Sequence, residues 1–274
     1  MRILVKSIAW IGVVLLCPVL YSQPQTPQPQ PVAAPEENIE NMTSIGLFTW
    51  RPDGGPQLIG GALSPNPPAQ SLVFPTKPSQ ANGIIATVRA KGESRVEISY
   101  FDVKDSGTSI ASRNLSIFGS NIVAGDVLAL DYHLRNLKVS WNYLTYPVPH
   151  LDSKFRFKTF WEFHYTQIRP VIAFPLKADP PVTAQQRIFY PAGGIGFEYI
   201  PSPKHFRIEA RGSAFGLPNR AVIWDGEGSM VGRFGPIEIF AGEKAYHFRT
   251  SPGKDIYMEG TLWGPYGGLR WVFR

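Results

Sequence analysis

The chain of 274 residues lacks the residues on which several common folds and sites depend. It has a single cysteine, Cys17, so a disulfide framework and a cysteine-based zinc site are both excluded. No apolar run reaches the roughly 20 residues that a membrane-spanning helix needs, which excludes a bundle of such helices. Lys and Arg form no cluster despite a net charge of +6, so the sequence gives no basis for nucleic-acid binding.

Catalytic signatures are also absent. The sequence contains no HExxH, no GxSxG, no phosphate-binding loop and no dinucleotide glycine pattern. The histidines are scattered: His133, His150, His164, His205 and His247. His247 with Glu243, or His133 with Asp131, could form a catalytic pair at a barrel rim, but nothing separates them from ordinary polar residues. We therefore assign no catalytic residue, cofactor or metal site, and enzyme activity stays open.

The composition favours β-structure. Gly and Pro contribute 26 residues each, which a mostly helical protein would not tolerate, and aromatic residues make up 13% of the chain. Charged residues account for only 18%. These values leave two fold classes, a soluble all-β domain and a membrane β-barrel.

The first 82 residues are expected to contain three segments. Residues 1–22 resemble a secretory signal peptide, because Arg2 and Lys6 precede a mainly apolar stretch that ends at the small residue Ser22. Residues 23–42 are rich in Pro and Gln and are expected to form a disordered linker. Residues 43–82 are interrupted by Pro and Gly and are predicted to be an irregular N-terminal segment that either adds one short strand or packs against the domain. The folded domain is predicted to span residues 83–274.

From residue 83 onward, apolar and polar residues alternate. In residues 155–167 the odd positions are mostly aromatic, whereas the even positions include Arg156, Lys158 and Glu162. A change of parity between Leu134 and Leu137 predicts a two-residue turn at Arg135 and Asn136. Ten strands are expected, with eight to twelve possible. They start near Ile84, Arg95, Asp126, Leu137, Phe155, Ile188, His205, Ala221, Ile237 and Tyr257.

Strand length favours the membrane barrel over a soluble sandwich. Strands of soluble domains usually have about 5 to 6 residues, whereas a tilted transmembrane strand needs roughly 9 to 11. The alternation here persists for about 10 to 13 residues. Aromatic residues lie toward the strand ends as often as within the strands, as an interfacial girdle requires. They are Trp141, Tyr143, Tyr146, Trp161, Tyr165, Tyr199, Trp263 and Trp271. We therefore expect the apolar side of every hairpin to face lipid.

Several segments resemble one group of proteins. The last strand, GGLRWVFR, and the stretches GDVLALDYHLRNLKVSWNYL, FRIEARGSAFGLPNRAVIWD and GEKAYHFRTSP are similar to those of Gram-negative outer-membrane β-barrels. The similarity covers residues 45–274 and is greatest to uncharacterised barrels of environmental bacteria. It implies an all-β, antiparallel up-and-down transmembrane β-barrel in the outer membrane, and it carries no activity.

The polar face of the strands is predicted to line the lumen. Opposite charges on neighbouring strands would pair there and leave a narrow or closed pore. The predicted lumen charge network comprises Arg156, Lys158, Glu162, Glu198, Arg207, Glu209, Arg211, Asp225, Glu227, Arg233 and Arg270, and Glu238 and Lys244 share the same face.

Three functional hypotheses stay open at this point. The first is a non-enzymatic outer-membrane barrel that acts as a structural, binding or narrow-pore element. The second is a barrel-embedded hydrolase or acyltransferase acting on outer-leaflet lipid or peptide. The third is a secreted soluble β-sandwich that binds a ligand. The first implies two partners, outer-membrane lipid and the barrel-assembly machinery, which would recognise the C-terminal strand.

Overall fold

The computed structural model describes residues 43–60, 72–74, 80–90, 94–117, 120–146, 154–202, 205–217, 220–251 and 256–273. The predicted signal peptide and linker lie outside these residues. No helix among them is long and apolar enough to cross a membrane.

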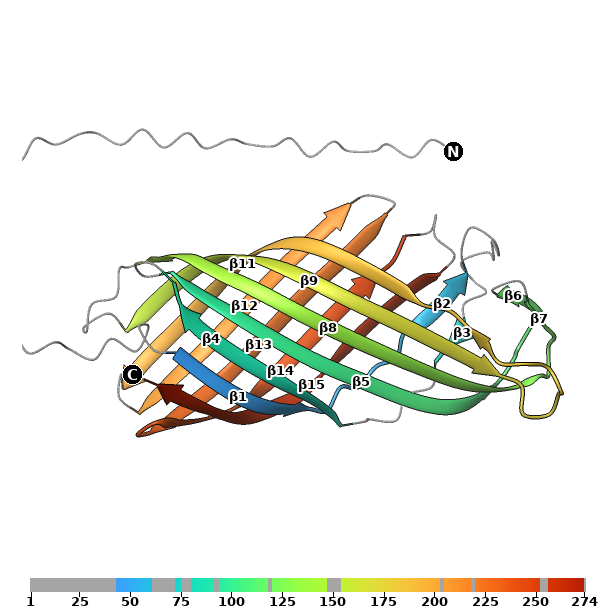
Figure 1. Cartoon of the computed structure of the whole chain (residues 1–274), viewed down its shortest axis with the longest axis horizontal. Helices are drawn as coiled ribbons and strands as arrows, with labels where there is room; N and C mark the ends of the chain where they lie inside the picture. Colours follow the sequence, from blue (N-terminus) through green and yellow to red (C-terminus); the bar gives the residue numbers. More distant parts are fainter. Residues whose placement is uncertain are drawn as a thin grey trace, which may run out of the picture. The chain divides into compact units, whose positions relative to one another are not determined.

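Ten antiparallel strands form a closed barrel (Figure 1). They are β1 (Thr43–Trp50), β4 (Ala81–Arg89), β5 (Arg95–Ile110), β8 (Val127–Tyr146), β9 (Phe155–Ala173), β11 (Gln186–Ser202), β12 (Phe206–Leu217), β13 (Ala221–Phe234), β14 (Ile237–Arg249) and β15 (Tyr257–Phe273). The barrel closes where β1 pairs with β15, with Thr43 opposite Phe273. The predicted barrel is confirmed, and the soluble sandwich is wrong because a single sheet closes on itself.

The remaining strands are short and lie outside this circuit. β2 (Gln57–Gly60) pairs with β15, and β3 (Leu72–Val73) pairs with β2. β10 (Val182–Thr183) pairs with β9, while β6 (Leu115–Ile117) and β7 (Ser120–Ile122) form a separate hairpin.

The connections differ between the two ends of the barrel. At the end where β1 begins and β15 finishes, which we call the terminal end, the connections are residues 90–94, 147–154, 203–205 and 235–236. At the opposite end, which we call the loop end, they are residues 51–80, 111–126, 174–185, 218–220 and 250–256. The three longest connections, residues 51–80, 111–126 and 174–185, all lie at the loop end. Outer-membrane barrels typically have their longer loops at one end and short turns at the periplasmic end.

The predicted number of ten strands is confirmed, but two of the assignments change. The predicted segments at Asp126 and Leu137 are one continuous strand, β8, of 20 residues. The tenth strand is instead β1, which belongs to the segment predicted to be irregular. The barrel therefore starts at Thr43 rather than near Gly83.

The polarity of β8 inverts along its length. Its even-numbered residues point into the lumen and change from Leu128, Leu130, Tyr132 and Leu134 to Asn136, Lys138, Ser140 and Asn142. Its odd-numbered residues point outward and change from polar to apolar beyond Arg135. The turn predicted at Arg135 and Asn136 is therefore wrong. A strand that passes from one environment into another produces the same parity change as a turn.

The outer faces of the neighbouring strands change from apolar to polar at the same register. One outward row is entirely apolar and runs across six paired strands: Leu47, Ile84, Tyr100, Leu137, Tyr165 and Phe189. The next outward row toward the loop end is entirely polar: Thr49, Asn82, Asp102, Arg135, Gln167 and Arg187. The outward apolar residues from this row toward the terminal end form what we call the belt. The boundary between the two rows is its upper edge, where upper means nearer the loop end.

Across these six strands the boundary divides the barrel wall into two halves with opposite polarity, a terminal half below it and a loop half above it. Below it the outer surface is apolar, and exposed rings there include Trp141, Phe155, Phe157, Trp161 and Trp271. Above it the outward residues of these six strands are mostly polar and the apolar side chains are buried inside, whereas the outward residues of β13 are apolar or glycine along the whole strand. On these strands the apolar side is therefore the outer face in the terminal half only, and in the loop half the rings meet in the middle of the barrel.

Candidate functional site

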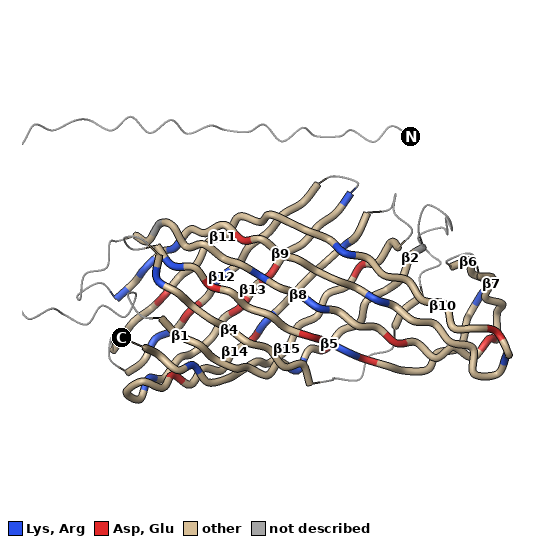
Figure 2. The backbone as a smooth tube through the Cα atoms, viewed as in Figure 1, with Lys and Arg blue, Asp and Glu red and all other residues tan. Residues whose placement is uncertain are grey.

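The strand alternation places all eleven residues of the predicted lumen charge network on inward positions. They come from β9, β11, β12, β13 and β15, and their distribution along the strands can be followed in Figure 2. Two further charged residues, Glu97 on β5 and Lys138 on β8, join them inside. The sequence analysis did not include Lys138 because it placed a turn at Arg135 and Asn136. In one continuous strand, Lys138 shares the inward face with Leu134 and Asn136.

A central cluster, which we call the ion-pair network, comprises Glu97, Lys138, Glu162, Arg211, Asp225, Glu227 and Lys244. Two lysines in it share the same acids. Lys138 Nζ lies 3.2 Å from Asp225 Oδ2 and 3.8 Å from Glu227 Oε1. Lys244 Nζ lies 3.0 Å from Asp225 Oδ1 and 3.1 Å from Glu227 Oε2. These contacts join β8 to strands on the opposite wall, so the network spans the lumen.

Arg211 holds the other side of the ion-pair network. Its guanidinium donates to Glu97 and to Glu162, each at 2.5 Å, and to the Ser140 hydroxyl at 2.7 Å. The same group lies 4.6 Å from the centroid of the Phe160 ring, a cation–π contact. Arg211 thus links four strands, β5, β8, β9 and β12.

The position of Phe160 depends on a glycine. A Cβ atom on Gly194 of β11 would lie 2.1 Å from Phe160 Cε2, which is far inside van der Waals contact. Gly194 therefore leaves the space that Phe160 occupies beneath the Arg211 guanidinium.

A second cluster lies nearer the terminal end. Arg207 binds Glu238 through two parallel hydrogen bonds of 2.6 and 2.8 Å and also donates to Glu209. Arg270 Nη1 lies 3.6 Å from Glu209, and its guanidinium stacks 4.4 Å from the Phe240 centroid. Lys158 Nζ lies 2.5 Å from Glu198. A cavity of about 60 Å³ lies among these groups, which is room for a few water molecules.

These charges are mutually dependent. Glu162 is 1% exposed and Lys138 2% exposed, so both have lost most of their hydration. Burying an ion costs several kcal/mol unless a partner and further hydrogen bonds compensate. The network provides several such contacts to each group. Removal of one member would therefore leave its partners with a buried charge that is less well compensated.

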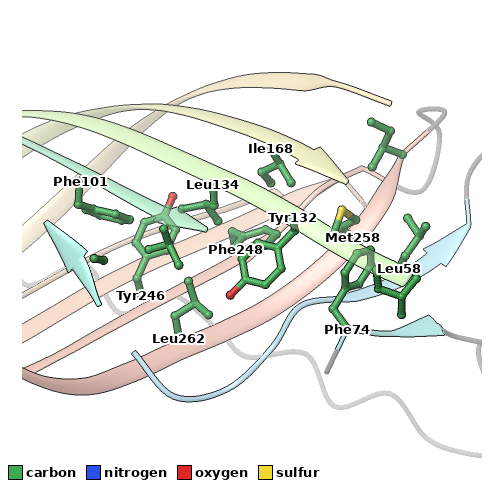
Figure 3. Close-up of a cluster of buried hydrophobic side chains, with 14 of the residues drawn as sticks. Leu58, Phe74, Phe101, Tyr132, Leu134, Ile168, Tyr246, Phe248, Met258 and Leu262 are labelled. Carbon is green, nitrogen blue, oxygen red and sulfur yellow. The ribbon is translucent and has the colours of Figure 1, made fainter. Parts of the chain in front are cut away.

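The loop half of the lumen is filled differently. An apolar core gathers there, with Leu58, Phe74, Phe101, Tyr132, Leu134, Ile168, Tyr246, Phe248, Met258 and Leu262 in Figure 3. Phe101 packs edge-on against both Trp50 and Tyr246, with ring centroids 5.3 Å apart in each case. The Tyr246 hydroxyl bonds Thr166 Oγ1 at 2.7 Å. This core closes the lumen a second time, above the ion-pair network.

The two histidines considered as catalytic candidates both lie on the outer surface. His133 Nε2 contacts Asp102 Oδ1 at 2.6 Å, rather than Asp131. His247 Nδ1 contacts Thr261 Oγ1 at 2.9 Å, and its ring stacks on Trp224. Within the described ranges no group of three or more His, Cys, Asp or Glu is arranged to hold a metal ion. Neither histidine therefore lies in a pocket of the lumen.

A scan against known protein families gives no match, and no curated protein matches the chain. Among solved structures, the chain is similar to the outer membrane protease OmpT from Escherichia coli. That likeness has 6% identity and a TM-score of 0.60, and it covers 86% of this chain and 98% of the protease.

Two further solved structures align with lower scores. The attachment invasion locus protein Ail of Yersinia pestis has 9% identity and a TM-score of 0.35, with 83% of this chain and 96% of Ail covered. The Pseudomonas putida toluene transporter TodX has 8% identity and a TM-score of 0.32, with 88% of this chain and 91% of TodX covered. The likeness to OmpT shows that the chain has the fold of a Gram-negative outer-membrane β-barrel.

Proposed function

We propose that the protein is a closed, non-conducting outer-membrane β-barrel that acts as a structural or binding element through its surface. One observation carries this proposal: the lumen is filled twice in series. The ion-pair network crosses the terminal half, and the apolar core fills the loop half. A solute passing through the barrel would have to break both, so transport through the lumen is not favoured.

The outer surface supports placement in a membrane. On β9 the outward residues stay apolar, apart from Thr159, from Phe155 to Tyr165, which matches the roughly 9 to 11 residues of a tilted transmembrane strand. Exposed apolar patches on soluble monomers rarely exceed a few hundred Å². The exposed rings of β8, β9 and β15 below the boundary lie on one outer face, and burial of that face against lipid is therefore favoured.

The expected route to the membrane follows from the same features. Residues 1–22 would direct export and be cleaved, and the C-terminal strand ending in Trp271 and Phe273 would be recognised by the barrel-assembly machinery. The short turns of the terminal end would then lie in the periplasm, and the loop end would face outward. A barrel-embedded hydrolase is the weaker alternative, because among the described residues an apolar core fills the lumen of the loop half and both candidate histidines lie on the outer surface.

Planar-bilayer recordings test the proposal. The full mature protein, folded into lipid and checked by its heat-modifiable mobility, should give no large steady conductance. Brominated lipids should quench the fluorescence of the outward residues Trp141, Trp161 and Trp271. A large steady conductance would contradict the closed lumen, and absence of quenching would contradict the placement of the belt in lipid.

A further inference from the structure

The outer face of β12, β13 and β14 is built from small residues around a single carboxylate. Glycine and alanine occupy its outward positions at mid-strand, and we call these six residues the small-residue face: Ala210, Gly212, Gly226, Gly228, Ala241 and Ala245. Glu243 is the central residue of β14, with Gly228 opposite on β13 and Pro265 opposite on β15. It is the one Asp, Glu, Lys or Arg among the outward residues of β12, β13 and β14 on the terminal side of Arg249.

Apolar side chains enclose this carboxylate from both ends of the barrel. Toward the loop end lie the exposed rings of Trp263 and Trp224, and toward the terminal end lie the exposed side chains of Met230 and Ile239. Within the described part of the barrel, the Glu243 carboxylate makes no hydrogen bond or ion pair. In the proposed placement this surface faces lipid, where a carboxylate without a partner is unfavourable.

The barrel itself gives no steric reason for the glycines of the small-residue face. A Cβ atom at Gly226 would meet no heavy atom of a non-adjacent residue within 4 Å, and at Gly212 and Gly228 the nearest would lie at 3.8 and 3.9 Å. Gly194 differs, because Phe160 occupies the space that its Cβ would need. Glycine inside a strand lowers stability and is found where another backbone approaches closely. The three glycines therefore indicate a second surface that approaches from outside the barrel.

A second copy of the chain has the chemistry that this surface needs. Two copies inserted in the same direction are related by a two-fold axis along the membrane normal, which brings their Glu243 residues to the same depth. A protonated carboxyl group donates one hydrogen bond and accepts another, so two such groups satisfy each other. Small residues around them let the two sheets approach closely, and packing and hydrogen bonds are what hold membrane segments together.

We propose that the small-residue face is the interface of a two-fold symmetric homodimer, in which the two Glu243 carboxyl groups are hydrogen-bonded to each other at the centre. The inference rests on the proposed placement of the barrel in the membrane, and it names the partner of the proposed binding element. Because the carboxyl contact lies between copies, replacement of Glu243 leaves the stability of a single barrel nearly unchanged.

The test is the dimer dissociation constant of the full mature protein in non-ionic detergent, measured by native mass spectrometry at mildly acidic pH. The wild-type protein should form a dimer. Glu243→Leu should raise the dissociation constant about tenfold or more, because the hydrogen-bonded pair is lost. Glu243→Gln should stay within about threefold of the wild type, since two amides also exchange hydrogen bonds.

A change of pH separates the carboxyl pair from packing alone. The wild-type dimer should dissociate when the pH is raised until both carboxyl groups are ionised, whereas the Glu243→Gln dimer should not respond. No outward residue beside Glu243 on β13 or β15 is titratable, and the nearest on β14 is His247. His247→Gln is therefore the control and should keep the response. A response that persists in Glu243→Gln would contradict the pair.

Steric variants identify the face. Gly226→Val combined with Gly228→Val adds side chains where a Cβ has room within the barrel, so the heat-modifiable barrel should persist while the dissociation constant rises about tenfold or more. Ala86→Val, at an outward position of β4 far around the barrel, is the matched control. In membranes, a short bismaleimide should join Ala245→Cys to its own copy and should not join Ala86→Cys.

Three outcomes would overturn the inference. They are a wild-type protein that stays monomeric, a dimer that tolerates Glu243→Leu or the double valine variant, and cross-linking of Ala245→Cys only to a protein of another mass. If brominated lipids quench the belt tryptophans while the protein stays monomeric, only the interface is wrong. If no quenching occurs, the membrane placement itself is wrong and the interface loses its basis.

Discussion

Phe101 on β5 and Asn136 on β8 lie opposite each other and are both buried in the lumen. Tyr246 from the opposite wall touches both, since its ring packs on Phe101 and its hydroxyl lies 3.3 Å from Asn136 Oδ1. This pair marks the level at which the lumen changes from the ion-pair network to the apolar core. The outward neighbours of the pair, Tyr100 and Leu137, mark the upper edge of the belt.

Tyr246→Phe should destabilise the barrel by about 1–2 kcal/mol, because Thr166 and Asn136 would lose a buried hydrogen-bond partner. Urea unfolding in lipid vesicles, followed by tryptophan fluorescence, measures the change. Tyr143→Phe on the exposed side of β8 is the control and should have almost no effect. Equal effects of the two changes would show that the Tyr246 hydroxyl contributes nothing specific.

Glu162→Ala should cost about 3–5 kcal/mol, because Arg211 and Lys138 would keep their buried charges with one carboxylate fewer. Glu243→Ala, which removes an exposed outward carboxylate of β14, should be nearly neutral. In the double variant Glu162→Ala/Arg211→Met, the loss should be smaller than the sum of the two single losses. Additive losses would contradict a coupled network.

Gly194→Ala should destabilise the barrel by about 1–3 kcal/mol, because the new methyl group would displace Phe160. Gly193 is the matched control, since a Cβ there meets only Trp161 at 3.7 Å, which is ordinary contact. The thermal midpoint of the heat-modifiable band should therefore fall for Gly194→Ala and not for Gly193→Ala. The reverse order would show that Phe160 does not occupy this position.

Opening only one half of the lumen should leave the barrel closed. Phe101→Ala with Leu134→Ala would loosen the apolar core, and Arg211→Ala with Glu162→Ala would loosen the ion-pair network. Because the two barriers lie in series, conductance should rise only when all four changes are combined. Single-channel recordings of the three folded variants measure this, and conductance after loosening one half alone would show that the other half does not seal the lumen.

Asp126 and Lys177 join two loops outside the belt, with 2.6 Å between Asp126 Oδ2 and Lys177 Nζ. The hydrogen bond from Lys177, together with one from the Val123 backbone, lowers the pKa of the Asp126 carboxyl. A carboxyl whose pKa is lowered by folding stabilises the folded state above its unfolded pKa, and this contribution disappears as the pH falls through the folded value. An NMR titration should show that Lys177→Met raises the Asp126 pKa, and an unchanged pKa would contradict the link.

The alternation of apolar and polar residues predicts the inward positions of some strands and fails for others. Alternation in β9 was enough to place Arg156, Lys158 and Glu162 on one face, because a strand has only two faces and the aromatic residues occupy the other. The same rule failed at β8, where the apolar face changes sides between Leu134 and Leu137. Periodicity records which residues share a face, and it does not record the environment of that face at each height.

The sequence by itself determined an all-β chain with long amphipathic strands, because a period of two and the strand lengths are local properties. Only the tertiary structure decided that Thr43 pairs with Phe273 to close the barrel, that Arg211 contacts Glu97 across the lumen, and that Asp102 rather than Asp131 engages His133. Each of these depends on which strands become neighbours and in what register. Closure brings together segments far apart in the chain, and no local repeat encodes that pairing.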